Sequence, residues 1–168
     1  AASHLGGLVV AATVDGLPVA RQLRLDPDLA VAVVVPDREL ATMAARAALP
    51  RSVPFSDATF NLGRLGLLLA GLADRRQLIG AAGEDRLHQG PRTALFPEAP
   101  ALLERLREGG AAIACWSGAG PSLLAICESG AAADVVRDAG ERALRELGVP
   151  GRALPPPIDR TGLVVTAE

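Results

Sequence analysis

The stretch Ser117-Gly118-Ala119-Gly120-Pro121-Ser122 separates two short apolar runs, residues 111–116 and 123–127. Each run has the length and composition of a strand, so the segment predicts a strand, a glycine-rich bend and a second strand. A bend with so few side chains leaves successive backbone N–H groups uncovered, with a serine at either end. Two interpretations stay open at this point: a site for an anion such as phosphate or carboxylate, and a tight hairpin without a ligand.

The composition limits what the chain can be. Its 168 residues are 49% hydrophobic but only 2% aromatic, so a core has to be built mainly from Ala, Leu and Val. A chain of this length can bury roughly two-thirds of its unfolded surface in one domain. The formal net charge of −2 gives no electrostatic reason to expect nucleic acid or an anionic membrane as a partner. No apolar run reaches the ~20 residues of a membrane span, and we expect a soluble, cytoplasmic protein.

Cys115 and Cys127 flank the bend on its two predicted strands. A cross-strand disulfide is conceivable there, but the spacing in a cytosolic-looking chain favours free, buried thiols. With His4 and His88 as the only histidines, no His, Cys and carboxylate cluster has the spacing of a metal site, so we assign no metal ligands.

Strand patterns occur mainly in the first third of the chain. Residues 8–12 and 18–25 flank Asp15-Gly16, a turn signal typical of a β-hairpin. The continuous apolar run over residues 29–35 predicts a strand buried on both faces. A last strand is expected at residues 162–166.

Apolar residues recur at three- and four-residue spacing in five further stretches, as in amphipathic helices. This periodicity predicts helices over residues 39–49, 56–72, 75–88, 98–108 and 131–147. Because strands and helices segregate partly rather than alternate strictly, the pattern indicates an α+β fold, an antiparallel sheet covered by helices.

Five segments also carry a family resemblance when they are taken in order. They are Leu5-Gly6-Gly7-Leu8-Val9, residues 42–50, Asn61-Leu62-Gly63-Arg64, Asp85-Arg86-Leu87-His88-Gln89 with Arg92 after it, and the bend at 117–122. Together they resemble the C-terminal half of the homoserine kinase family, within the GHMP small-molecule kinase superfamily. The resemblance implies ATP-dependent phosphorylation of the L-homoserine hydroxyl in threonine biosynthesis, in a groove between two halves of the protein.

The resemblance also implies how the chain is organised. Residues 1–168 would form one ferredoxin-like GHMP kinase C-terminal domain, preceded in a longer parent protein by an ATP-binding N-terminal half. The opening at Ala1 without a methionine agrees with this, and nothing in the chain matches the family's phosphate loop Pro-x-x-x-Gly-Leu-Gly-Ser-Ser-Ala-Ala. ATP and Mg²⁺ would be bound mainly by that N-terminal half, and we expect the isolated chain to be inactive.

Carried over residue by residue, the resemblance places Arg46 and Arg92 on the substrate's α-carboxylate, with Thr42 lining the same pocket. A guanidinium suits this task because its planar fork of donors matches a carboxylate. Without the resemblance, two surface arginines in ordinary ion pairs would be the default interpretation. His88 is expected to bond a carbonyl or a water rather than to act as a general base.

The bend would support the phosphate loop of the N-terminal half by close packing of Gly118, Ala119 and Gly120. Ser117 and Ser122 would add hydrogen-bond donors. No catalytic residue is assigned within the chain, since phosphoryl transfer depends chiefly on alignment and charge neutralisation.

Two alternative functions stay open. One is another GHMP kinase, acting on a different hydroxylated metabolite; the other is a non-catalytic ferredoxin-like module that binds an amino acid as a regulatory ligand. Loss of an N-terminal half would expose apolar surface, so we also expect self-association of the isolated chain, and a homodimer is one form that this can take.

Overall fold

The computed structural model describes residues 2–166 and contains two antiparallel sheets. One is a hairpin of β1 and β2; the other has four strands in the order β4-β5-β3-β6. The strands are β1 (Leu8–Val14), β2 (Leu17–Leu23), β3 (Ala30–Pro36), β4 (Ile113–Trp116), β5 (Leu123–Cys127) and β6 (Gly151–Leu154). The helices are α1 (Ala2–Leu5), α2 (Thr42–Ala47), α3 (Phe55–Ala73), α4 (Gln89–Arg92), α5 (Ala99–Glu108) and α6 (Gly130–Glu146), with 3₁₀ turns η1 (Arg75–Gln77), η2 (Gly80–Gly83) and η3 (Thr93–Leu95).

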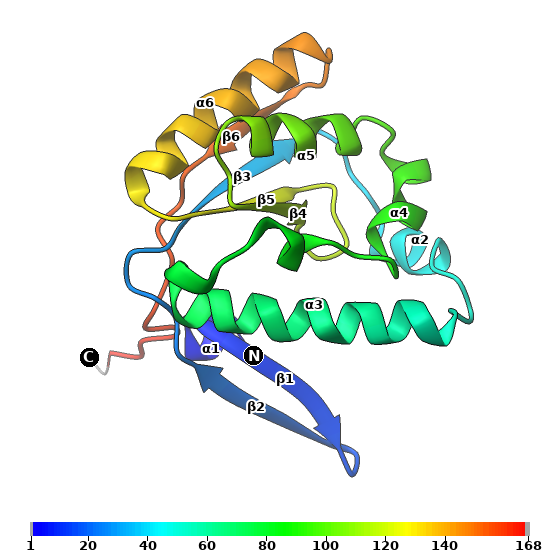
Figure 1. Cartoon of the computed structure of the whole chain (residues 1–168), viewed down its shortest axis with the longest axis vertical. Coiled ribbons are helices and arrows are strands. Elements are labelled where there is room, and N and C mark those ends of the chain that lie inside the picture. The colour runs from blue at the N-terminus through cyan, green and yellow to red at the C-terminus, as the bar shows by residue number, and fades with distance from the viewer. Residues whose placement is uncertain (1, 167–168) are drawn as a thin grey trace.

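The four-stranded sheet has ferredoxin-like connectivity. β3 leads through the helical segment to β4, the bend joins β4 to β5, and α6 returns the chain to β6 beside β3. Helices α5 and α6 cover one face of the sheet, while α3 runs along the other side and the β1-β2 hairpin lies beyond α3 (Figure 1). The predicted α+β fold with an antiparallel sheet covered by helices is confirmed.

The main core lies between the sheet and the pair α5 and α6. Leu102 and Leu106 of α5 and Val136 and Leu144 of α6 are all at most 2% exposed. A Cβ on Gly140 of α6 would lie 3.0 Å from Val34 and 3.1 Å from Ala153, so the glycine lets the helix settle on β3 and β6. Burial of each Leu contributes about 2 kcal/mol.

A smaller core forms under the C-terminal part of α3, where Leu68 and Leu72 pack on Leu29, Ile113 and Ile126. The N-terminal part of α3 has no such cover within the described residues. Its apolar side chains remain at the surface, and the same holds for parts of α2 and the hairpin. The most exposed of them are Phe55 (85%), Met43 (83%), Leu62 (69%) and Leu17 (68%).

Three expectations about secondary structure are wrong. Residues 75–88 form the turns η1 and η2 and a loop instead of a helix, and the Asp85 carboxylate accepts the N–H groups of Leu87 and His88 that a helix would bond to its own carbonyls. Residues 162–166 have no regular structure, and β6 is the last strand. Strand β3 is fully buried on one face only, at Ala32, Val34 and Pro36, whereas Val31, Val33 and Val35 on the other face are half-buried.

Both cysteines are free, as expected from their spacing. Burial raises the pKa of Cys127 to about 11, so its thiol stays protonated and unreactive at neutral pH. Within residues 2–166, no helix combines the length and apolarity that a membrane span requires.

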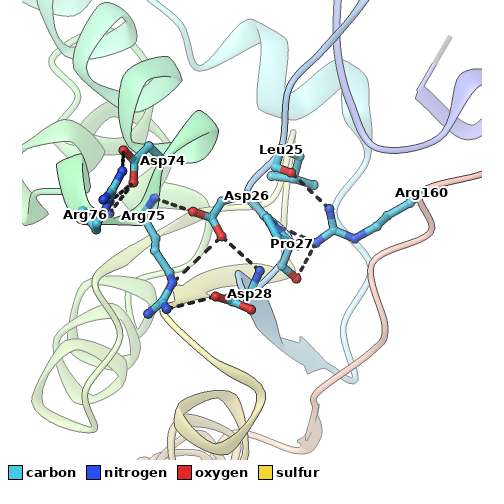
Figure 2. Close-up of polar contacts among 8 residues, drawn as sticks. All are labelled: Leu25, Asp26, Pro27, Asp28, Asp74, Arg75, Arg76 and Arg160. Carbon is cyan, nitrogen blue, oxygen red and sulfur yellow. Dashed lines mark hydrogen bonds and ion pairs between the residues drawn. The ribbon is translucent and has the colours of Figure 1, made fainter.

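A polar cluster joins the hairpin, the end of α3 and the C-terminal tail; we call it the Asp26 cluster. It consists of Leu25, Asp26, Pro27, Asp28, Asp74, Arg75, Arg76 and Arg160 (Figure 2). The Asp26 carboxylate accepts the N–H groups of Asp28 (3.0 Å) and Arg75 (2.9 Å). Arg160 donates to the carbonyls of Leu25 (3.3 Å), Asp26 (3.0 Å) and Pro27 (3.1 Å). The hydrogen bonds of Arg160 hold the C-terminal tail against the segment that connects β2 to β3.

Candidate functional site

The bend between β4 and β5 is closed by its own backbone. The Ser117 N–H donates to the Ser122 carbonyl (2.9 Å), and the Gly120 N–H donates to the Ser117 carbonyl (3.1 Å). In the described part of the chain, the successive N–H groups of Gly118 and Ala119 have no hydrogen-bond partner. The prediction of uncovered donors therefore holds for this pair, which can face an anion.

Gly120 has no freedom to carry a side chain. Its φ is +84°, and a Cβ would lie 2.6 Å from two ring atoms of Trp116 and 3.5 Å from Leu40. Both the backbone conformation and the close approach to the indole require glycine here. Gly118 also has a positive φ of +60°, but a Cβ there would meet open space.

Arg92 of α4 is fixed to this bend. Its side chain is buried, with the residue 9% exposed, and Nη1 donates to the Gly118 carbonyl at 2.7 Å. The same Nη1 lies 3.2 Å from Nδ1 of His88. Nε is buried without a hydrogen-bond partner. No carboxylate of the described residues lies within ion-pair distance of this guanidinium.

A buried cation without a counter-ion is unusual, because arginine is rarely buried unless it is paired. The guanidinium stays charged at any physiological pH. Arg92 therefore combines a fixed position with N–H donors that have no partner, which suits the binding of an anionic group.

Asp85 organises the segment that precedes α4. Its carboxylate is 6% exposed. One oxygen accepts the N–H groups of Leu87 (3.1 Å), His88 (2.7 Å) and Gln89 (2.7 Å), and the other accepts the Asn61 amide of α3 (2.6 Å). Burial raises the pKa of Asp85, but these hydrogen bonds outweigh it and hold the pKa below its ordinary value. Asp85 thus remains a carboxylate and fixes the start of α4.

His88 lies between Asp85 and Arg92. Because a guanidinium only donates, Nδ1 of His88 has to accept the contact from Arg92. Nε2 lies 3.6 Å from an Asp85 oxygen. Burial and the Arg92 charge lower the pKa of His88, while Asp85 opposes them, and the pKa lies below its ordinary value. Nδ1 of His88 thus has a side-chain partner, Arg92, that the sequence did not predict.

Gln89 joins α4 to the edge of the sheet. Its side chain donates to the Gly83 carbonyl (3.2 Å) and accepts the N–H of Trp116 (3.2 Å), the residue before the bend. A cavity of about 210 Å³ opens behind this segment, lined by residues that include Asn61, His88, Gln89 and Cys115. The site therefore has a supporting layer that connects α3, α4 and β4.

Arg46 and Thr42 are exposed on α2. Neither side chain has a hydrogen bond or ion pair with another described residue, so no such bond joins them to Arg92 or the bend. The segment leading into α2 does reach the bend, because Leu40 lies within contact distance of the Cβ position of Gly120. Figure 1 draws α2 and α4 at the same end of the molecule.

Sequence reasoning missed the supporting roles of Asn61, Asp85 and Gln89, which entered only as parts of a family resemblance. An aspartate a few residues before a helix is a signal that could have been used, because such carboxylates commonly accept the first free N–H groups. Among residues 2–166, no group of three or more His, Cys, Asp or Glu side chains could hold a metal ion.

Comparisons with known proteins identify the family of the chain. Residues 63–146 match the family model described as GHMP kinases C terminal, and the chain belongs to this family of small-molecule kinase domains. Over most of its length it is similar to homoserine kinases. It is 46% identical over 143 residues to that of Streptomyces avermitilis, which covers 84% of this chain and 46% of the relative. It is 39% identical over 163 residues to that of Deinococcus radiodurans, which covers 95% and 52%.

Solved structures show the same fold. The crystal structure of homoserine kinase from Cytophaga hutchinsonii superposes with a TM-score of 0.79 at 24% identity, over 86% of this chain and 46% of that one. Mevalonate kinase of L. major, in complex with R-mevalonate, has a TM-score of 0.62 at 18% identity, over 90% and 50%. The chain thus spans about half the length of the relatives that it matches.

Proposed function

We propose that the chain is the substrate-side half of a homoserine kinase, which transfers the terminal phosphoryl group of ATP to the hydroxyl of L-homoserine in threonine biosynthesis. The observation that carries the proposal is Arg92, a buried guanidinium without a carboxylate partner in the described residues, bonded to the glycine bend. An amino-acid substrate offers the carboxylate that such a group lacks. The names of the relatives supply the identity of the amino acid.

In this proposal, Arg92 and Arg46 bind the substrate's α-carboxylate and Thr42 lines the same pocket. Arg92 is preorganised, whereas Arg46 stands on an exposed face of α2 and is free to move onto a ligand. Holding the carboxylate by two guanidinium groups would fix the hydroxyl for attack, and orientation of this kind supplies much of the rate in phosphoryl transfer.

The bend would lie close to the phosphates. Gly118, Ala119 and Gly120 present backbone and no bulky side chain, and the free N–H groups of Gly118 and Ala119 can donate to phosphate oxygens. Ser117 and Ser122 add hydroxyl donors at either end. From the resemblance to the family, we assign Mg²⁺ and most of the nucleotide site to the N-terminal half.

We further propose that residues 1–168 form one domain that follows this N-terminal half in a longer protein. The exposed apolar side chains of α2, α3 and the hairpin support an extensive partner surface on that side of the molecule. Because the nucleotide site would lie on the N-terminal half, the isolated 168-residue chain would have no kinase activity.

A coupled ADP-release assay tests the proposal. The full-length protein should turn over ATP with L-homoserine, and the 168-residue chain should not. Preference for mevalonate or a sugar over homoserine would instead favour another GHMP kinase. A native protein of 168 residues without any longer form, which binds an amino acid and consumes no ATP, would favour a regulatory module.

A further inference from the structure

We infer that His88 is a positioning residue that holds Arg92 against the glycine bend only while its imidazole is neutral, so that protonation of His88 loosens the arginine. The consequence for catalysis rests on the proposed function, in which Arg92 binds the substrate carboxylate. The coupling between the two side chains is a property of the chain itself.

The geometry gives His88 a single hydrogen-bonding state. Arg92 Nη1 donates both to the Gly118 carbonyl (2.7 Å) and to His88 Nδ1 (3.2 Å). Nδ1 has to be unprotonated to accept, so the proton of the neutral ring sits on Nε2, which faces an Asp85 oxygen at 3.6 Å. Asp85, His88 and Arg92 thus form a chain of contacts that ends at the bend.

Protonation would change both ends of the His88–Arg92 contact. Nδ1 would become a donor, and two cations would face each other at 3.2 Å. Arg92 could no longer keep Nη1 on both partners, because repulsion from the imidazolium would push the guanidinium away from His88. The hydrogen bond to Gly118 would be strained or lost with it.

Other charged groups face the imidazole as well. Asp85 lies on the loop before α4, and Arg92 lies on α4 itself. The cavity that His88 lines is also lined by Arg64 of α3, by Glu84 directly after η2 and by Cys115 of β4. Arg64 is already paired with Glu84 at 2.9 Å, which leaves Asp85 and Arg92 as the charges that set the balance at the ring.

Burial is the main cause that lowers the pKa of His88, Asp85 opposes it, and the charge of Arg92 adds a smaller lowering effect. Its protonation in the folded chain therefore falls below the value of about 6.5 of an unperturbed histidine. Above that range the contact with Arg92 is intact, and it weakens as the pH drops through the lowered pKa.

Nitrogen NMR of the unliganded, ¹⁵N-labelled 168-residue chain tests the coupling directly. With only two histidines in the sequence, His4→Asn assigns the ring signals of His88. We expect an unprotonated Nδ1 and a protonated Nε2 at neutral pH, and an upward shift of the His88 titration in Arg92→Met but not in Arg92→Lys, which keeps the charge. A proton on Nδ1 at neutral pH, or an unchanged titration in Arg92→Met, would overturn the inference.

Kinetics of the full-length protein test the consequence. The oxygen of asparagine can occupy the place of the His88 Nδ1 acceptor, whereas glutamine places its oxygen nearer the Nε2 position. At saturating ATP, we expect the KM for homoserine to rise on acidification in wild type but to stay flat in His88→Asn. His88→Leu, which lacks any acceptor, should raise the KM about tenfold at every pH, and His88→Gln should fall between the two.

The ratio of wild type to His88→Asn at each pH removes the titration of ATP and of the assay components. Equal pH profiles for these two proteins would contradict the role of His88. Absence of homoserine turnover in wild type would contradict the proposed function instead, and the NMR signals of the unliganded chain would still decide the coupling.

Discussion

Two polar clusters of this molecule are built around an arginine, Arg160 at the surface and Arg92 in the interior, and they differ in the partners that the guanidinium has. In the Asp26 cluster, Arg160 donates to three carbonyls, and the Asp26 carboxylate accepts two N–H groups (Figure 2). At the bend, the buried Arg92 has an Nε without a partner in the described residues and no carboxylate within ion-pair distance. In the Asp26 cluster the buried group is a carboxylate whose oxygens accept hydrogen bonds and the arginine is solvent-exposed, whereas at the bend the buried group is a cation with an unpaired donor.

The difference separates a structural role from a binding role. A buried polar group that has all its partners stabilises the fold and has nothing left for a ligand. A buried cation whose N–H donors lack partners lowers the stability of the fold until an anion binds to it. An unpaired donor on a buried cation is therefore the criterion by which we assign the ligand site to Arg92 and not to the Asp26 cluster.

The largest expected effect comes from Arg92→Ala in the full-length protein. Loss of one partner in a buried, charge-assisted contact costs about 3–5 kcal/mol, so kcat/KM for homoserine should fall about a thousandfold. Steady-state kinetics measure this, with Arg92→Lys as a variant that keeps the charge but lacks the fork. An Arg92→Ala enzyme with wild-type kcat/KM would place the carboxylate elsewhere.

Gly120→Ala should give the next largest effect, on stability. The new methyl group would overlap the Trp116 ring at a positive φ, and we expect a loss of about 2–4 kcal/mol in the free energy of unfolding. Urea denaturation of the 168-residue chain measures it. Gly118→Ala is the matched control: its Cβ meets open space, so only the backbone strain of about 1 kcal/mol remains. Equal losses in the two variants would contradict the packing of Gly120 on the indole.

Arg160→Ala tests the comparison at the Asp26 cluster. It removes three hydrogen bonds to exposed or half-buried carbonyls, and we expect the free energy of unfolding to fall by about 1 kcal/mol. In the full-length protein the KM for homoserine should not change. A higher KM for homoserine in Arg160→Ala would mean that the two clusters are not functionally separate.

The smallest effect concerns the acid stability of the Asp26 cluster. The backbone N–H of Arg75, followed by that of Asp28, holds the pKa of Asp26 below its usual value. The unfolded chain then binds the proton more readily, so the stabilisation is present above pH ~4 and is lost as the pH falls through the lowered pKa. Asp26→Asn should lower the urea midpoint at pH 7, with a smaller difference from wild type in acid.

Asp37→Asn controls for the loss of one carboxylate, because the Asp37 side chain is exposed and has no hydrogen bond or ion pair with another described residue. If the gap between wild type and Asp26→Asn were constant from pH 7 to acid, the carboxylate of Asp26 would not carry this stability.

Patterns in the sequence were sufficient for elements with strong local signals. The hairpin at Asp15-Gly16, helices α5 and α6, and the two strands around the bend lie close to their predicted positions. Strand β6 was missed because four residues with a glycine and an arginine show no periodicity. The strand depends on distant partners, namely β3 and the Glu141 carboxylate, which accepts the N–H of Ala153.

The site was accessible to sequence reasoning only in part. The glycine pattern predicted the bend and its free N–H groups, and family resemblance singled out Arg92. The contact of Arg92 with Gly118 joins residues 26 positions apart, and no local pattern encodes it. The roles of Arg46 and Thr42 stay predictions, since both side chains are exposed on α2.

The fastening of the tail to the first residues of the chain bears on the order of events during synthesis. Arg160 reaches carbonyls more than 130 positions earlier, and the backbones of Gly6 and Gly162 approach so closely that neither has room for a side chain. The hairpin is translated before the sheet, yet the tail residues that anchor it are translated only after every strand of the sheet. The contacts of Arg160 and Gly162 with this part of the chain can therefore form only once the whole sheet has been synthesised, which makes them a late step of folding during translation.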